Sequence, residues 1–146
     1  MRYLLDANAL IALLNDTTSA IARRIRRYAP RDFGVSAVVM HELYYGAFKS
    51  DRVEKNVARV DGLQFPVLEF DLEDARQAGE IRAHLASKGT PIGPFDVLIA
   101  GQARARELTV VTHNTSEFQR VPRLKVEDWK GSPSQRRRKD SRDKDR

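Results

Sequence analysis

Short apolar runs alternate with segments of helical character along the whole chain. Two of these runs, residues 2–6 (RYLLD) and 109–112 (TVVT), are continuously apolar, which is typical of strands covered on both faces. Strands that alternate with helices form parallel sheets, because each helix crosses over one face of the sheet. The alternation predicts an α/β fold, a central parallel sheet of four to five strands flanked by helices, with strands at residues 2–6, 33–36, 65–70, 109–112 and 123–129.

The segments between the apolar runs carry the start and stop signals of helices. Ser36 can cap a helix that begins at residue 37, and Pro30 ends the helical pattern before it. Gly89 stops a long amphipathic segment, and Pro94 suits the first turn of the next helix. We therefore expect helices at residues 7–15, 17–29, 37–49, 51–62, 72–89 and 94–107.

Four acidic residues lie where this topology brings separate segments together. Asp6 ends the first strand, Glu117 follows the fourth, Glu42 interrupts an apolar helix, and Asp96 lies in the first turn of another helix. Residues that follow parallel strands meet at one edge of the sheet, where α/β proteins bind their ligands. Singly, each acid has an ordinary explanation, as a helix cap, a complement to a helix dipole, a solvated helix residue or a loop acid.

Taken together, the four carboxylates indicate a cation site. Carboxylates gathered at one edge repel one another, which raises their pKa values, and a divalent cation removes that cost. The chain has no cysteine, and a set of oxygen ligands favours a hard ion such as Mg²⁺ or Mn²⁺. Such ions keep bound waters and engage phosphates, so the implied chemistry is metal-assisted hydrolysis of a phosphodiester.

The helix expected at residues 94–107 frames one of these acids. Phe95, Leu98 and Ile99 recur at the spacing i, i+3, i+4 and are expected to anchor the helix in the core. Asp96 is rotated away from this stripe, with the small residues Ala100 and Ala103 on its side. We therefore expect its carboxylate to project at the carboxyl edge of the sheet.

Aromatic residues and histidines near the acids have no required catalytic role. His41 adjoins Glu42 and points roughly 100° away from it on a helix, so we expect it to be structural or exposed. His113 lies near the expected site, but a metal-bound water needs no histidine as base. The aromatic residues of the third helical segment are expected to pack or to form a dimer surface: Tyr44, Tyr45 and Phe48.

Positive charge is concentrated at the C-terminus of a chain whose formal net charge is +6. Residues 132–146 hold seven Lys or Arg and three Asp, and no apolar residue beyond Pro133. Such a segment cannot bury enough apolar surface to fold. We expect one domain over residues 1–130 and a basic, disordered tail over residues 131–146, either simply solvated or adding nonspecific affinity for nucleic acid.

The N-terminal segment does not resemble a signal for export. Asp6 and Asn8 interrupt its apolar part, and no small-residue cleavage site follows. No apolar stretch approaches the ~20 residues of a membrane-spanning helix. We expect a soluble, cytoplasmic protein without a membrane partner.

Several segments resemble one protein family in the same order and spacing. They are LLDANALI at residues 4–11, SAVVMHELYYGA at 36–47, the long segment 89–121 that begins GTPIGPFD, and LKVEDW at 124–129. These segments resemble the PIN-domain ribonucleases, specifically the VapC toxins of bacterial toxin–antitoxin pairs. The resemblance covers about residues 2–129 and implies a PIN-like fold and a divalent-metal-dependent endoribonuclease that acts as a toxin.

The resemblance also implies roles for individual residues. Asp6, Glu42 and Asp96 would bind Mg²⁺ or Mn²⁺, and Glu117 would be a fourth, looser catalytic acid. Three further residues would support the site, with Asn8 steadying it by hydrogen bonding and with Thr112 and Asn114 lining it. One departure is Ala7, because the family commonly has threonine between the aspartate and the asparagine.

A substrate and partners follow from the same resemblance. It implies cleavage of structured RNA, with a tRNA anticodon loop as the expected target, by water attack that leaves a 5′-phosphate and a 3′-hydroxyl. GTPIGPFD is most similar to the subgroup associated with initiator tRNA. A VapB-type antitoxin and a homodimer are implied as well.

Two other function classes stay open at this point. An aspartyl-phosphate phosphohydrolase would also place Asp6 after the first strand, but it needs a second aspartate where this chain has Asn8. A catalytically silent RNA- or protein-binding PIN module is compatible with the basic tail. The intact set of acids argues against this second alternative.

Overall fold

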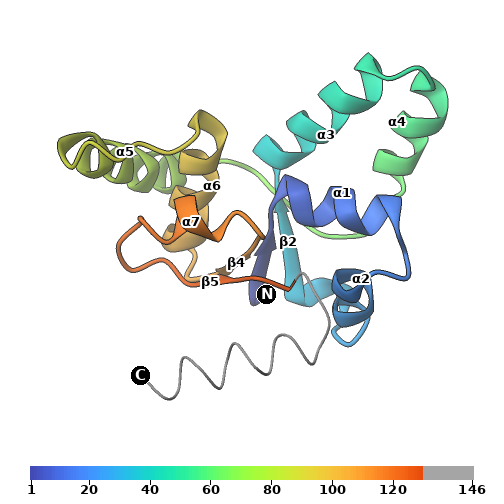
Figure 1. Cartoon of the computed structure of the whole chain (residues 1–146), viewed down its shortest axis with the longest axis horizontal. Helices are drawn as coiled ribbons and strands as arrows, with labels where there is room; N and C mark the ends of the chain where they lie inside the picture. The colour runs from blue at the N-terminus through green and yellow to red at the C-terminus, as the bar shows by residue number, and fades with distance from the viewer. Residues whose placement is uncertain (130–146) are drawn as a thin grey trace.

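The computed structural model of the chain describes residues 1–129, which form one parallel sheet with helices on both sides (Figure 1). The five strands run in the order β3-β2-β1-β4-β5. Their bounds are Tyr3–Leu5 for β1, Phe33–Ser36 for β2, Val67–Leu68 for β3, Thr109–Val111 for β4 and Val126–Glu127 for β5. The predicted α/β class and parallel sheet are confirmed. The expected tail over residues 131–146 lies outside the described residues.

The register of the central strands determines where the chain presents polar groups. Leu5, the last residue of β1, pairs with Val35 on one side and Val111 on the other. Asp6 therefore follows at the same edge as Thr112, and its backbone N–H donates to the carbonyl of Val111 at 3.2 Å. Two chain segments more than a hundred residues apart thus end side by side.

The helices form two groups, one on each side of the sheet (Figure 1). The first group is α1 (Ala7–Asn15), α2 (Ala20–Ile25), α3 (Ala37–Lys49) and α4 (Val53–Asp61); the second is α5 (Leu72–Ser87), α6 (Pro94–Ala105) and the short α7 (Thr115–Phe118). All six predicted helices are present, but α7 and the 3₁₀ turn Pro30–Asp32 were not predicted. Within residues 1–129, no helix has the length and apolar character needed to cross a membrane.

The helix expected at residues 17–29 is shorter than predicted. It begins only at Ala20, because the Ser19 hydroxyl accepts a hydrogen bond from the N–H of Ala22 and so caps the helix there. After Ile25 the chain leaves the helix through a turn, and Pro30 begins the 3₁₀ turn that leads into β2. Local capping, rather than the apolar spacing, therefore determines the bounds of α2.

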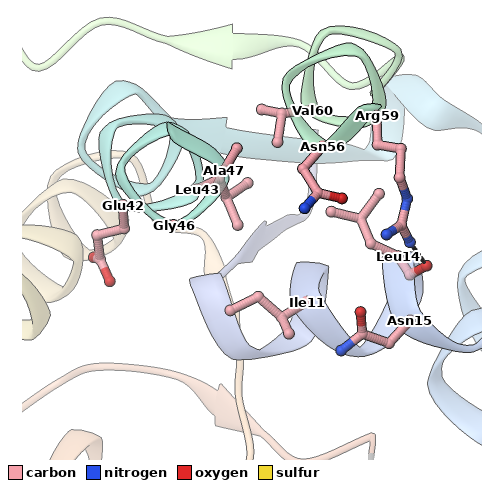
Figure 2. Close-up of a pocket in the computed structure, with 10 residues that line it drawn as sticks. All are labelled: Ile11, Leu14, Asn15, Glu42, Leu43, Gly46, Ala47, Asn56, Arg59 and Val60. Carbon is pink, nitrogen blue, oxygen red and sulfur yellow. Dashed lines mark hydrogen bonds between the residues drawn. The ribbon is translucent and has the colours of Figure 1, made fainter. Parts of the chain in front are cut away.

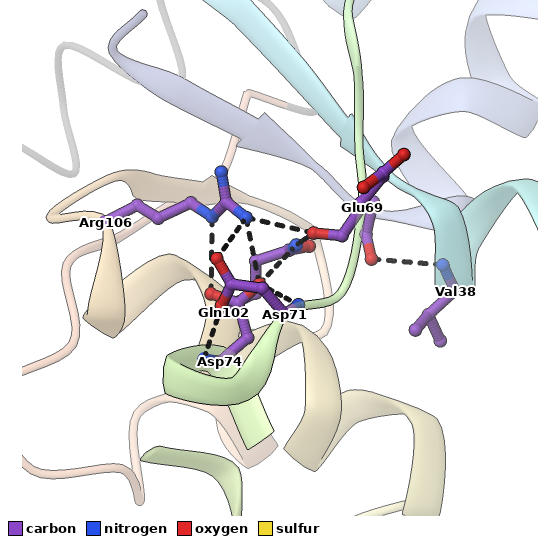
Figure 3. Close-up of polar contacts among 7 residues, drawn as sticks. Val38, Glu69, Asp71, Asp74, Gln102 and Arg106 are labelled. Atoms are coloured by element: carbon purple, nitrogen blue, oxygen red, sulfur yellow. Dashed lines mark hydrogen bonds and ion pairs between the residues drawn. The ribbon is translucent and has the colours of Figure 1, made fainter. Parts of the chain in front are cut away.

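A partly buried ion pair links the end of α6 to the start of α5 (Figure 3). The Arg106 guanidinium donates to both carboxylate oxygens of Asp74, at 3.3 and 3.0 Å, and to the carbonyl of Glu69 at 2.9 Å. Gln102 donates to the same Asp74 carboxylate and to the same carbonyl, each at 3.0 Å. Burial opposes ionisation of Asp74, but these donors hold its pKa below its ordinary value.

Farther along the same contact, α5 and α6 touch backbone to backbone. A Cβ atom added to Gly101 would lie 2.5 to 2.6 Å from the N, Cα and Cβ atoms of Ala78, closer than atoms can pack. Only glycine therefore permits this crossing. Together with the Arg106–Asp74 pair, the crossing fixes the rotation of α6 about its own axis.

The first turn of α6 differs from the expectation drawn from the sequence. Phe95 is 43% exposed and does not anchor the helix in the core, so this expectation is wrong. Ile99 is buried, as expected, and Leu98 is half-buried. Val97 is buried too, as are Ala100 and Ala103, the small residues expected on the side of Asp96. Phe95 shares a helix face with the buried Ile99, so its exposure comes from its place in the first turn of α6, at the end of the helix.

We predict that Gly101→Ala destabilises the protein by about 1–3 kcal/mol, because the added methyl group overpacks the crossing. Gly79→Ala is the matched control, since Gly79 lies on α5, a Cβ atom there would have no neighbour within 4 Å, and alanine favours helix. Urea unfolding measures both variants. If the Gly101→Ala protein is as stable as the Gly79→Ala protein, α5 and α6 are not in close backbone contact at Gly101.

Candidate active site

Asp6 lies at the point where β1 ends and α1 begins. Its carboxylate caps α1 by accepting a hydrogen bond from the N–H of Ala9 at 2.8 Å. It also accepts from the Thr112 hydroxyl, which itself accepts from the N–H of Asn114 at 2.9 Å. Burial raises the pKa of Asp6, while these donors oppose the rise. The capping role and a role in the site therefore coexist in one residue.

Glu42 extends from α3 toward the same edge. One of its oxygens, Oε1, is buried and has no hydrogen-bond partner among the described residues. Burial and the negative charge of Asp6 both raise the pKa of Glu42. A buried carboxylate oxygen without a donor is costly, so this oxygen has the properties of a ligand-binding atom.

Asp96 and Glu117 share a hydrogen bond across the site. Burial raises the pKa of Asp96 to about 7, with further contributions from Glu117, Asp6 and Glu42. The same hydrogen bond lowers the pKa of Glu117, so the two carboxyl groups share a proton and titrate as a pair. The Asn114 amide donates to both carboxylates, at 2.6 Å to Glu117 and 3.3 Å to Asp96.

Gly93 supports this pair in a way that the sequence did not reveal. Its backbone N–H donates to Glu117, and a Cβ atom there would lie 3.3 Å from Oδ2 of Asp96. Glycine at this position therefore leaves room for the Asp96 carboxylate.

Other polar residues lie on the rim of the carboxylate cluster, which we define as Asp6, Glu42, Asp96 and Glu117. Asn8 is exposed, and its backbone N–H rather than its side chain supports Asp6. His41 is exposed, as predicted, and His113 is exposed close enough to Asp6 for its charge to lower that pKa. Arg120 donates to the carbonyl of Pro91 at 2.9 Å, and its charge favours ionised Glu117.

Comparison with known proteins identifies the family. The family model described as the PIN domain matches residues 3–124. The chain belongs to the PIN-domain family. It is 41% identical over 131 residues to a protein of Salmonella typhimurium named tRNA(fMet)-specific endonuclease VapC, covering 88% of this chain and 98% of that one. With the same coverage, it is 34% identical to Ribonuclease VapC2 of Haemophilus influenzae.

Solved structures of PIN domains agree with this placement. The DNA-bound VapBC of Salmonella typhimurium superposes with a TM-score of 0.84 at 41% identity, covering 88% of this chain and 98% of that chain. VapBC2 of Rickettsia felis superposes with a TM-score of 0.83 at 32% identity, covering 88% and 99%. The predicted resemblance to VapC ribonucleases is confirmed, and this membership leaves no support for the aspartyl-phosphate alternative.

The carboxylate cluster of this PIN domain fits a divalent cation by its chemistry. It offers only oxygen donors, one of them the unpartnered Oε1 of Glu42, and the mutual repulsion is relieved by positive charge. Within residues 1–129, no three acidic or histidine side chains already stand at the spacing of a metal cluster. We attribute the wider separation of these carboxylates to two hydrogen bonds that hold them elsewhere: the one between Asp96 and Glu117, and the one by which Asp6 caps α1.

An open groove of about 270 Å³ leads away from Glu42 between α1, α3 and α4 (Figure 2). Its walls are apolar along most of their length, formed by Ile11, Leu14, Leu43, Ala47 and Val60. At the far end lie Asn56 and Arg59, and the Arg59 guanidinium donates to the carbonyl of Leu14. The carboxylate cluster is thus continuous with an apolar surface.

We predict that, without metal, the free energy of unfolding falls as the pH rises from about 4 to about 7. Asp96 titrates near 3.8 in the unfolded chain and at about 7 in the folded protein, so only the folded state holds this proton within that window. Urea unfolding in EDTA at several pH values measures how the free energy of unfolding changes with pH. Asp96→Asn is the reference, and equal slopes for the two proteins would contradict the raised pKa.

Proposed function

We propose that this protein is the toxin of a toxin–antitoxin pair and an Mg²⁺- or Mn²⁺-dependent endoribonuclease. The observation that carries the proposal is the convergence of Asp6, Glu42, Asp96 and Glu117 at the carboxyl edge of the sheet. Curated relatives with the same fold are named endonucleases or ribonucleases. The Ala7 departure leaves all four carboxylates intact, which favours an active enzyme over a silent module.

In this proposal Asp6, Glu42 and Asp96 hold the ion. Bound there, the ion would supply positive charge to neutralise the scissile phosphate and would make the attacking water more acidic. Asp96 would lose its proton to solvent when the site is loaded, and Glu117 would stay ionised beside it. Asn114 and Gly93 hold Glu117 so that it can orient the attacking water and accept its proton. Attack of the water oxygen on phosphorus would break the bond from phosphorus to the 3′ oxygen, which would take up a proton from solvent. The products would be a 5′-phosphate and a 3′-hydroxyl.

For the substrate we propose a tRNA, with the anticodon loop of initiator tRNA as the first target. Relatives in Salmonella typhimurium and Shigella flexneri, 41% and 40% identical, carry the name tRNA(fMet)-specific endonuclease. Unpaired loop bases can be splayed out and held individually, unlike bases within an A-form helix. This substrate also places the protein in the cytoplasm.

A VapB-type antitoxin is the proposed protein partner, since similar structures are VapBC complexes. The groove beside Glu42 is suited to apolar side chains of such a partner (Figure 2). An arginine inserted from the groove into the carboxylate cluster would compete with both the metal and the phosphate. For the homodimer, the exposed rings of Tyr45 and Phe48 on α3 are the proposed contact surface.

We predict that the purified full-length protein cleaves bacterial tRNA when Mn²⁺ is present, and that EDTA abolishes cleavage. Asp96→Asn should lower the rate by about 100-fold or more, because a ligand and its charge are lost. His84→Ala, an exposed change on α5, serves as the matched control. Sequencing of the fragment ends identifies the target. Intact tRNA and ribosomal RNA with both the original and the Asp96→Asn protein would overturn the proposal.

A further inference from the structure

Two exposed rings meet at the rim of the carboxylate cluster. The ring centroids of His41 and Phe95 lie 5.6 Å apart, with the ring planes tilted by 57°. His41 directly precedes Glu42 on α3, and Phe95 directly precedes Asp96 on α6. Each ring is therefore attached beside one acid of the proposed site, and the pair bridges the two helices that carry these acids.

The exposure of this pair distinguishes it from the aromatic residues of the core. Phe95 is 43% exposed, although its neighbours Val97 and Ile99 are buried. In a tilted contact neither ring lies flat over the other, so ring surface stays open to solvent. A single exposed phenylalanine is ordinary on a protein surface. A second exposed ring in contact with it, next to four carboxylates, is a more specific arrangement.

The chemistry of the site explains why such a pair is useful. An ion in the carboxylate cluster would attract any phosphate of an RNA, so holding one particular base beside the cluster takes contacts to the base itself. Aromatic rings provide them, because every nucleobase has a flat face that stacks on a ring. Proteins that recognise single-stranded RNA loops commonly hold splayed bases in this way.

We propose that His41 and Phe95 form a stacking platform for an unpaired RNA base next to the phosphodiester that is cleaved. The inference rests on the proposed ribonuclease function and adds to it the residues that position the substrate. The platform lies on the rim, so the base stacks outside the carboxylate cluster while the adjoining phosphate reaches into it.

Binding of an uncleaved RNA tests the platform. The probe is a fluorescently labelled RNA hairpin with the anticodon stem and loop of bacterial initiator tRNA, titrated with full-length Asp96→Asn protein in Mg²⁺. Adding Phe95→Leu, which keeps an apolar side chain but removes the ring, should raise the Kd by about 5- to 100-fold. Phe95→Tyr keeps the ring and should change the Kd by less than about twofold.

Abasic hairpins identify the stacked base. Removing that one loop base should weaken binding to the Phe95 protein and have no further effect on the Phe95→Leu protein, since both changes delete the same contact. Leu72→Ala, which removes an exposed apolar side chain from α5, is the control that should leave the Kd unchanged. Thermal unfolding verifies that every variant is folded.

Three outcomes would overturn the platform. An unchanged Kd for Phe95→Leu, with RNA cleavage by the Asp96-containing protein intact, rejects the platform and retains the proposed function. If Phe95→Leu abolishes binding of the antitoxin but leaves binding of RNA unchanged, the two rings belong to a protein interface instead. Absence of RNA cleavage by the Asp96-containing protein rejects the proposed function, and the platform with it.

Discussion

Four carboxylates held together against their mutual repulsion are the constraint on which the rest of this structure depends. Burial and the neighbouring negative charges raise the pKa of Asp96 to about 7, and they raise the pKa of Glu42 as well, while burial raises that of Asp6. Side chains in such an arrangement separate unless rigid elements hold them. The buried strand β1 supplies Asp6, and packed helices supply Glu42 and Asp96.

The rigidity of α6 comes largely from its end opposite Asp96. Arg106 and Gln102 bind the buried carboxylate of Asp74 (Figure 3). Gly101 allows α5 to approach within backbone contact. These contacts fix the rotation of the helix, so Asp96 faces the cluster while Phe95 lies on its rim. Stability far from the site and geometry within it are thus two aspects of one helix packing.

The sequence predicted those features of the fold that depend on residues close together in the chain. The continuous apolar strands, the helix caps and the carboxylate after β1 were all identifiable, because each depends on neighbours in the chain. The exposure of Phe95 was not, since it depends on which other elements cover the first turn of α6. Likewise, the role of Gly93 depends on Asp96 and Glu117 and has no local signal. The roles proposed for the four acids stay predictions that experiment must test.

The most direct test of the account is a calorimetric titration of Mn²⁺ into the metal-free, full-length protein just below pH 7, in two buffers with different ionisation enthalpies. Asp96 still holds its proton to a large extent at this pH, so the account predicts that Mn²⁺ binds and releases protons to the buffer. It further predicts that Asp96→Asn weakens binding and removes that proton release. Binding without proton release, or equal binding by both proteins, would contradict the account.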